Sequence, residues 1–369
     1  MGDAETHATI LAGRWYDSVH HHGTGTGPVA TGYWATVTAI DGRHDPAGPS
    51  ELQLEVTGSC NLSCQMCLVA YRPRLGRSAS LSVGTVRQIL DDLPSVRRLT
   101  LQGLGEPLLA PDLDAIVAEA VARGIEVGFN TNGTLLSKAR SAALIAAGLS
   151  WIHVSIDGAN AETYADIRRG GHLATVVTNL RDLVAARREA GTATPWVQLN
   201  VVAMRANRGE LDALVRLAAD VAVDRLWVQG LSHDFSDVGE DPTYVRIRRW
   251  TDEQLLRPDE VAALTEEMTA LATSIGLDVR LPGRGTMPSR RDGEPACDWP
   301  WRSAYVNHDG TVQACCMLMG RHRGAMGNVH ERPLSQLWNG ADYTALRAQL
   351  STDQPPTMCH GCSLYRHRF

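Results

Sequence analysis

The stretch Glu51-Leu-Gln-Leu-Glu-Val-Thr-Gly-Ser-Cys60-Asn-Leu-Ser-Cys64-Gln-Met-Cys67 decides how this chain is interpreted. A β-rich run, residues 51–56, leads directly into three cysteines with the spacing C-x3-C-x2-C. Soft thiolate ligands favour iron–sulfur clusters or zinc over hard metal ions. Three thiolates at this spacing can wrap one face of a [4Fe–4S] cluster and leave the fourth iron open to an outside ligand. The alternative is a structural zinc site completed by a histidine, although this loop contains none.

From residue 51 onward, β-rich runs alternate with runs of helical periodicity. Such alternation is typical of parallel βα units, and six closely spaced strands predict an α/β fold, a partial (β/α)6 barrel of the TIM type. In such barrels the chemistry lies on loops at the carboxyl ends of the strands, which is where the cysteine loop falls. We expect strands at 51–56, 98–102, 125–130, 151–156, 196–203 and 225–229, and helices at 82–90, 112–123, 137–147, 175–190 and 208–219.

A second group of cysteines lies in the last quarter of the chain. Cys297 precedes a turn at 307–310, and Cys315 follows that turn, whose glycine suits a tight hairpin. Cys359 and Cys362 add a C-x2-C pair further on. Together these four thiolates are enough to complete a [4Fe–4S] cluster with no open iron, and a four-cysteine zinc ribbon is the alternative.

Composition limits the partners and the compartment. The 369 residues carry a formal net charge of -6 with both signs mixed along the chain, which does not support nucleic-acid binding. We find no run of 18 or more apolar residues that could span a membrane, and no basic and apolar leader typical of a secretory signal. We therefore expect a cytoplasmic protein whose clustered cysteines act as metal ligands rather than form disulfides.

The three-cysteine loop and the motifs that follow it resemble the radical S-adenosylmethionine (SAM) superfamily. Gly105-Glu106-Pro107 is similar to the family's GGEP stretch, with Leu104 in place of one glycine. Met66 stands where the family usually has an aromatic residue, and its flexible thioether can pack against adenine. The resemblance implies a SAM-binding [4Fe–4S] cluster on Cys60, Cys64 and Cys67, and SAM contacts from Met66, Gly105, Glu106, Asn132, Ser155, Asp157 and Arg168.

Two of these contacts have roles that the resemblance specifies. Glu106 would accept hydrogen bonds from the SAM amino group, and Arg168 would meet the SAM carboxylate region. Asn132, Ser155 and Asp157 follow the third and fourth strands and would help hold the ribose and methionine portions.

The C-terminal cysteines resemble the SPASM/twitch appendage of the same enzymes, in its one-cluster form. The resemblance implies an auxiliary [4Fe–4S] cluster on Cys297, Cys315, Cys359 and Cys362. We expect four parts: an N-terminal extension at 1–47, a radical SAM partial barrel at 48–235, a connector at 236–296, and a small domain of β-hairpin and helix at 297–369.

The chemistry that the resemblance implies is hydrogen abstraction from substrate by a 5′-deoxyadenosyl radical. An external one-electron donor such as flavodoxin or ferredoxin would reduce the cluster. A fully ligated auxiliary cluster can accept an electron, which favours net oxidation. Our preferred substrate is a small molecule of the sugar, aminocyclitol or nucleoside type, oxidised at an alcohol in natural-product (antibiotic) biosynthesis, because only about 50 residues precede the first strand.

Several alternatives stay open at this point. An epimerase, deoxygenase or decarboxylase could act on a similar substrate, a ribosomal peptide could be the substrate, or the chain could modify a partner enzyme. Cys316 is left over and is a candidate hydrogen donor for an epimerase, or a small buried hydrophobe. Alternation in a strand would point Cys315 and Cys316 to opposite faces. Arginines of the segment 231–296 could pair with a substrate carboxylate or phosphate.

Overall fold

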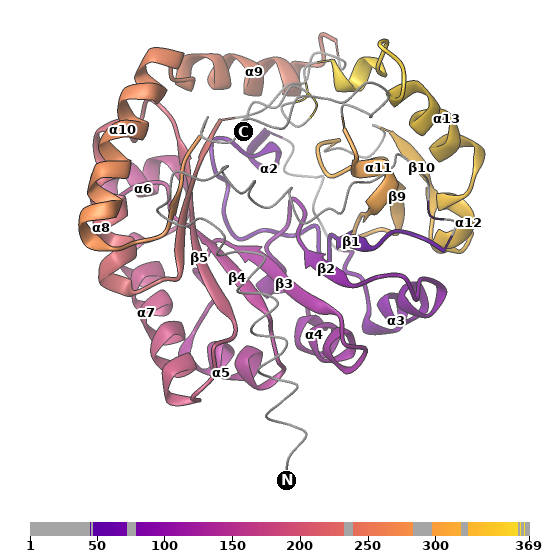
Figure 1. The fold of residues 1–369 in the computed structure, drawn as a ribbon, viewed down its shortest axis with the longest axis horizontal. Helices are drawn as coiled ribbons and strands as arrows, with labels where there is room; N and C mark the ends of the chain where they lie inside the picture. Colours follow the sequence, from indigo (N-terminus) through magenta and orange to yellow (C-terminus); the bar gives the residue numbers. More distant parts are fainter. Residues whose placement is uncertain are drawn as a thin grey trace, which may run out of the picture.

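A single sheet with the strand order β10-β9-β8-β1-β2-β3-β4-β5-β6-β7 organises the molecule (Figure 1). The structure, a computed structural model, describes residues 45, 47–71, 79–231, 239–282, 297–318, 324–360, 362 and 365. Almost all of the expected N-terminal extension, residues 1–47, and part of the expected connector, residues 236–296, therefore lie outside the described residues.

Six parallel strands form the open barrel that the sequence predicts. Each pairs in parallel with the next, so their carboxyl ends meet at one rim, and the two-residue strand β7 (Val279–Arg280) extends the series beyond β6. The fold class predicted from the sequence is thus confirmed. The six strands are β1 (Glu51–Leu54), β2 (Arg98–Leu101), β3 (Glu126–Thr131), β4 (Trp151–Ser155), β5 (Trp196–Ala203) and β6 (Arg225–Gly230).

Helices cover the outer face of this sheet (Figure 1). Their starts follow local chemistry, because the side chains of Ser82, Ser137 and Asn160 accept hydrogen bonds from backbone N–H groups of the first helical turn. The helices and 3₁₀ turns between β1 and β7 are α2 (Leu68–Tyr71), α3 (Val83–Asp92), η1 (Pro107–Leu109), α4 (Leu113–Ala122), α5 (Lys138–Ala146), α6 (Ala161–Ile167), α7 (Leu173–Glu189), η2 (Arg208–Glu210), α8 (Leu211–Val221), α9 (Pro242–Gln254) and α10 (Pro258–Ile275).

The C-terminal segment joins the barrel sheet directly. Strand β8 pairs in parallel with β1, and β9 and β10 continue the sheet in antiparallel fashion. This segment covers the edge of β1, which would otherwise leave unpaired backbone groups. Its elements are α11 (Trp299–Arg302), β8 (Ser303–Val306), β9 (Thr311–Gln313), β10 (Ala325–Asn328), α12 (Leu334–Trp338), α13 (Ala341–Leu350) and η4 (Thr357–Cys359).

The two faces of the barrel strands differ in polarity. In β5, Val197, Leu199 and Val201 are fully buried against the helices, whereas Gln198 and Asn200 alternate with them on the inner face. In a parallel sheet that is packed on both faces, the sequence of each strand is a nearly continuous run of apolar residues. The polar inner positions therefore indicate a barrel interior that is prepared for a polar ligand rather than filled as a hydrophobic core.

Cationic and aromatic side chains occupy the amino-terminal end of this interior. The guanidinium of Arg98 lies 5.2 Å from the Trp151 ring centroid, and that of Arg225 lies 5.0 Å from the Trp196 ring centroid. The His153 ring stands 4.5 Å from Trp151. Burial, together with the charges of Arg98 and Arg225, lowers the pKa of His153 to about 3, so the imidazole is neutral at physiological pH.

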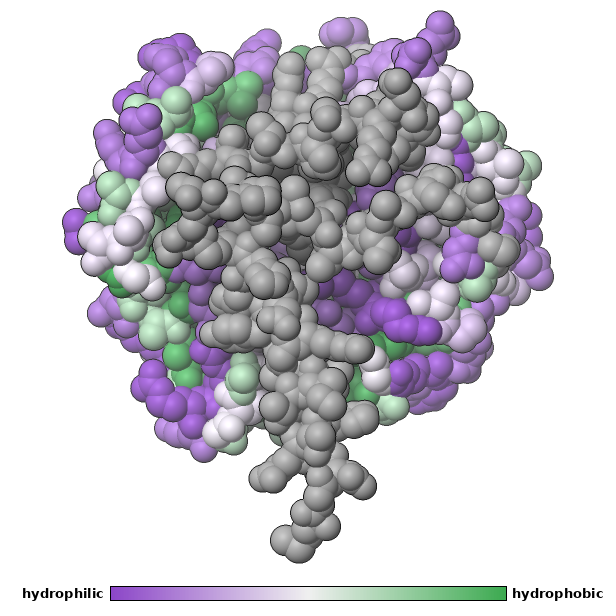
Figure 2. All heavy atoms as spheres, in the orientation of Figure 1, coloured by the Kyte–Doolittle hydropathy of each residue, from purple (hydrophilic) through white to green (hydrophobic). Residues whose placement is uncertain are grey.

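The outer surface is that of a water-exposed protein on the face shown in Figure 2. Hydrophilic residues cover most of the described helical rim, with hydrophobic residues in small separate patches. Among the described helices, none is both long enough and apolar enough to cross a membrane.

Candidate active site

The cysteine loop that follows β1 is fastened through Gln65. Its backbone N–H donates to the carbonyl of Ile167 at 2.9 Å, and its side-chain amide donates to the carbonyl of Asp166 at 2.7 Å. Its side-chain oxygen accepts a hydrogen bond of 2.8 Å from the indole N–H of Trp250 in α9. Gln65, which lies between Cys64 and Cys67, thus connects the cysteine loop to both α6 and α9.

The loop after β2 packs directly on the cysteine loop. A Cβ atom on Gly105 would lie 1.9 Å from the carbonyl oxygen of Thr57, so only glycine fits there. The backbone N–H of Glu106 donates to the carbonyl of Ser59 at 2.8 Å. The packing of the two loops therefore explains why residue 105 is glycine, which the sequence motif alone does not reveal.

Glu106 lies buried at the junction of the first three strand ends. One carboxylate oxygen accepts from the Thr131 hydroxyl at 2.6 Å and from the Leu108 N–H at 3.1 Å, and the other accepts from the Asn132 N–H at 2.8 Å. Burial raises the pKa of Glu106, and these hydrogen bonds oppose that rise. A carboxylate offers about four acceptor positions, so one remains for an outside donor.

Asn132 contacts the cysteine loop with its side chain. Its amide nitrogen donates to Asn61 at 2.9 Å, and its oxygen accepts from the backbone and hydroxyl of Thr134. Asn61 lies between Cys60 and Cys64 and donates to the Thr134 hydroxyl at 2.8 Å. This polar cluster fixes the cysteine loop against the end of β3.

Asp157 and Arg168 form a buried ion pair. One carboxylate oxygen of Asp157 accepts from two guanidinium nitrogens of Arg168 at 2.7 and 2.6 Å, and the other accepts from the Val202 N–H at 2.7 Å. Burial acts to lower the pKa of Arg168, but the charges of Asp157 and Cys64 outweigh it and raise the pKa. Both carboxylate oxygens of Asp157 therefore accept hydrogen bonds within the chain, and Asp157 orients the guanidinium, which faces the cysteine loop.

The chemistry of the first three cysteines fits an iron–sulfur cluster. Burial raises the pKa of Cys60 to about 11 and that of Cys67 to about 12, and both thiols also feel the charge of Cys64. Three thiols close enough to disfavour one another's ionisation call for a cation that binds thiolates. Within the described residues, no three Cys, His, Asp or Glu side chains converge on one metal ion. In a [4Fe–4S] cluster each cysteine binds a different iron.

The C-terminal cysteines also come together. Burial raises the pKa of Cys297, and the charges of Cys315 and Cys362 raise it further. Burial also raises the pKa of Cys315, and the charges of Cys362 and Cys359 raise it further. Cys316 shares this environment, since burial and then Cys362 and Cys297 raise its pKa to about 12. Residues 315 and 316 lie after the end of β9, so strand alternation does not separate them and that expectation was wrong.

Met66 and Ser155 complete the residues that the sequence indicates. Met66 is buried among Ile167, Met204 and Leu231, with Trp250 packed against them. Ser155 ends β4 and is partly exposed, and its hydroxyl makes no hydrogen bond within the described residues.

Sequence reasoning missed Tyr164 of α6. Its ring is fully buried, and its hydroxyl has no hydrogen-bond partner among the described residues. Burial raises the pKa of Tyr164 to about 12, with further effects from Arg168 and Cys64. A tyrosine in a short helix after a strand carries no sequence signal of this placement.

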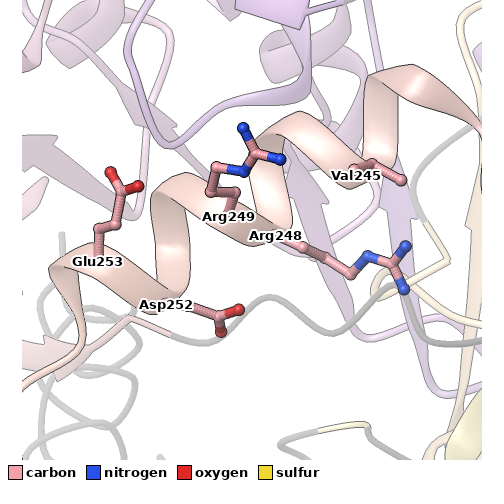
Figure 3. Close-up of a pocket in the computed structure, with 5 residues that line it drawn as sticks. All are labelled: Val245, Arg248, Arg249, Asp252 and Glu253. Atoms are coloured by element: carbon pink, nitrogen blue, oxygen red, sulfur yellow. The ribbon is translucent and has the colours of Figure 1, made fainter.

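Of the arginines in the segment 231–296, Arg246, Arg248 and Arg249 lie on α9. Arg248, Arg249, Asp252 and Glu253 line a hollow of about 550 Å³ together with Val245. Figure 3 shows Arg249 and Glu253 on one side of the helix and Asp252 on the other. The hollow carries mixed charge on the helix that Trp250 ties to the cysteine loop.

An open parallel barrel with a three-cysteine loop after its first strand, extended by a hairpin with a second cysteine group, defines an enzyme built on iron–sulfur clusters. The family model described as the radical SAM superfamily matches residues 54–218, and the SPASM model, an iron–sulfur cluster-binding domain, matches residues 297–363. The chain belongs to the radical SAM superfamily and carries a C-terminal SPASM domain. SAM and [4Fe–4S] clusters are therefore its cofactors, with one auxiliary cluster in the SPASM domain.

Relatives of known name match across most of the chain. The mycofactocin maturase MftC of Mycobacterium ulcerans is 33% identical over 87% of this chain and 82% of its own length. The tungsten-containing aldehyde ferredoxin oxidoreductase cofactor-modifying protein of Pyrococcus furiosus is 27% identical, covering 85% and 87%. The PqqA peptide cyclase of Rhizobium meliloti is 27% identical, covering 85% and 79%.

Among solved structures, Streptococcus suis SuiB bound to its precursor peptide SuiA has a TM-score of 0.64 and 17% sequence identity. The alignment covers 87% of this chain and 71% of SuiB. At this identity the similarity concerns the fold alone.

Proposed function

We propose that this chain is a radical SAM maturase that modifies a ribosomally made peptide. The observation that carries the proposal is its similarity, over more than three quarters of both chains, to a mycofactocin maturase and a PqqA peptide cyclase. These relatives favour the peptide over the sugar-like substrate preferred in the sequence analysis.

In this proposal Cys60, Cys64 and Cys67 hold the SAM cluster, and Cys297, Cys315, Cys359 and Cys362 hold the auxiliary cluster. Bound SAM and its reduced cluster supply a 5′-deoxyadenosyl radical that removes a hydrogen atom, and the auxiliary cluster supplies an acceptor for one electron. Reduction comes from an external donor such as flavodoxin or ferredoxin.

The chain's own residues bind and orient SAM. Glu106 keeps one acceptor position for the SAM ammonium group, since its other positions are filled from within the chain. Arg168 meets the SAM carboxylate region, and Asp157 acts through Arg168 rather than by direct contact. Gly105 and Asn132 hold the cysteine loop in place, while Met66 and Ser155 contact SAM directly.

The barrel interior suits an uncharged part of a peptide. Gln198 and Asn200 face it, and their side chains bond to each other at 2.7 Å. Asn130 and Gln229 are partly exposed, and their side chains make no hydrogen bond within the described residues. Amide side chains both donate and accept, which matches a peptide backbone or a neutral polar side chain.

The test is SAM cleavage by the anaerobically reconstituted enzyme with three substrate panels: short peptides encoded near its gene, aminocyclitols and sugar nucleosides, and cofactor-bearing redox enzymes. The proposal predicts that a peptide stimulates 5′-deoxyadenosine formation at least tenfold and itself changes mass. Stimulation by the sugar-like panel alone would overturn the peptide assignment. Stimulation by a redox enzyme would support cofactor modification, a second candidate favoured by the Pyrococcus furiosus relative.

A further inference from the structure

A buried acid–histidine pair joins the barrel to the C-terminal segment. Nδ1 of His308 lies 2.6 Å from a carboxylate oxygen of Glu55, and the His308 backbone N–H lies 3.4 Å from the same oxygen. Glu55 is 3% exposed and His308 is 8% exposed. Because an ionised carboxylate only accepts, the imidazole donates. Glu55 directly follows β1, and His308 lies in the turn between β8 and β9.

Two glycines make room for this pair. A Cβ atom on Gly58 would lie 2.6 Å from the His308 ring, and one on Gly103 would lie 2.3 Å from the Glu55 side chain. Gly58 begins the cysteine loop, and Gly103 begins the loop that carries Glu106. Both loops of the SAM site therefore pack directly against the pair.

The other carboxylate oxygen of Glu55 reaches the SAM site itself. It accepts a hydrogen bond of 2.6 Å from the Leu104 N–H, in the loop whose Gly105 rests on Thr57. His308 lies in the turn that leads through β9 to Cys315. The pair therefore links the loop that binds SAM to the segment that carries the cysteines of the SPASM domain.

We propose that Glu55 and His308 are positioning residues that fix the SPASM domain against the SAM site, so that hydrogen abstraction and the following oxidation act on the same bound substrate. This inference rests on the proposed function for the identity of the substrate. Stability alone does not explain the pair, because buried ionic pairs are often replaceable by apolar residues without loss of stability. Their best-attested value is in fixing one arrangement among several.

The substitutions are nearly isosteric. Glu55→Gln keeps the volume, but its amide nitrogen cannot accept, so either the Leu104 or the His308 hydrogen bond is lost. His308→Leu removes the donor, and His308→Asn restores one. The matched control is Glu51→Gln, which breaks another contact between β1 and the C-terminal segment, the 2.7 Å ion pair between Glu51 at the amino-terminal end of β1 and Arg302 at the end of α11.

The experiment measures product formed per 5′-deoxyadenosine in the iron-loaded enzyme. We expect modified product per 5′-deoxyadenosine to fall at least fivefold in Glu55→Gln and His308→Leu, whatever their rate of SAM cleavage. His308→Asn should recover at least half of the loss, and Glu51→Gln should behave as wild type. Equal uncoupling in Glu51→Gln, or full coupling in both Glu55→Gln and His308→Leu, would overturn the inference.

Hydrogen exchange keeps the inference testable if no peptide is processed. Such a failure would count against the proposed function alone. In the iron-loaded protein, Glu55→Gln should raise amide exchange at least threefold both at residues 103–106 and at residues 307–310, while Glu51→Gln leaves both segments protected. If Glu55→Gln left either segment unchanged, the pair would not connect the two sites and the inference would be wrong.

Discussion

At the residue scale, single atoms decide how the site is built. Gly105, Glu106 and Asn132 fix the cysteine loop through one forbidden Cβ position and a few short hydrogen bonds. Gly105 is the most restrictive of these positions, because a Cβ atom there would clash with backbone atoms, which no side-chain rotation can move.

We predict that Gly105→Ala loses the SAM cluster. A contact of 1.9 Å with the Thr57 carbonyl forces the two loops apart, at a cost of about 3 kcal/mol or more. The control is Gly209→Ala, where a Cβ would meet nothing within 4 Å. Iron content and urea unfolding measure both variants. A Gly105→Ala protein with wild-type iron and stability would show that the loops do not pack as described.

Cys315 and Cys316 lie in the same environment, but only Cys315 is a proposed ligand of the auxiliary cluster. Wild type should hold about eight irons, by four per cluster. Cys315→Ser should hold about four irons, because the auxiliary cluster loses a ligand, whereas Cys316→Ser should hold about eight. Iron analysis after anaerobic reconstitution decides between them. The reverse pattern would move the ligand assignment from Cys315 to Cys316.

His153 predicts a pH dependence of stability. Its folded pKa of about 3 lies below the ordinary value of 6.5, so between these values the unfolded chain binds more protons. Stability then falls as pH drops below about 6.5, and by pH 5 this group alone costs about 2 kcal/mol. His153→Gln should lose correspondingly less stability between pH 7 and pH 5 in urea unfolding. An identical pH profile in the two proteins would contradict the neutral, buried histidine.

At the scale of elements, α9 acts as a support for the cysteine loop. Its apolar positions Tyr244 and Ile247 are buried, and Trp250 reaches across to Gln65. The helix carries five charged side chains from Arg246 to Glu253.

We predict that Trp250→Phe weakens SAM binding. The substitution keeps an aromatic ring beside Met66 but removes the indole N–H that donates a hydrogen bond to Gln65. We expect this to cost about 1 kcal/mol of binding free energy, which raises the SAM dissociation constant roughly fivefold. Asp252→Asn, at an exposed position of the same helix, is the control and should bind as wild type. Calorimetry on the reconstituted proteins measures both. Unchanged affinity in Trp250→Phe would mean that α9 does not support the site.

The sequence predicts those elements that local pattern determines. Strands β1 to β6 and helix α10 follow runs whose periodicity is visible within ten to twenty residues. The contacts between Gln65 and Trp250 and between Glu55 and His308 join residues 185 and 253 positions apart, and no local pattern encodes them. The four-residue strand β8 was likewise missed as a neighbour of β1, because pairing partners of short strands depend on the tertiary fold.

At the scale of the whole molecule, one continuous sheet carries both cysteine groups. Strand β1 leads into the SAM-site loop, and its neighbour β8 leads into the SPASM hairpin, so two adjacent strands in the same register place the two sites side by side. This arrangement suits a substrate that is held once while it is attacked and then oxidised.

The most direct test of the central claim is transfer of deuterium from a peptide to 5′-deoxyadenosine. A precursor peptide that stimulates SAM cleavage is synthesised with deuterium at each residue in turn and incubated anaerobically with the enzyme, and both products are weighed by mass spectrometry. The account predicts that one labelled residue gives 5′-deoxyadenosine one mass unit heavier, together with a modified peptide. Cleavage of SAM without deuterium transfer from any labelled peptide, but with transfer from a labelled sugar-like compound, would contradict it.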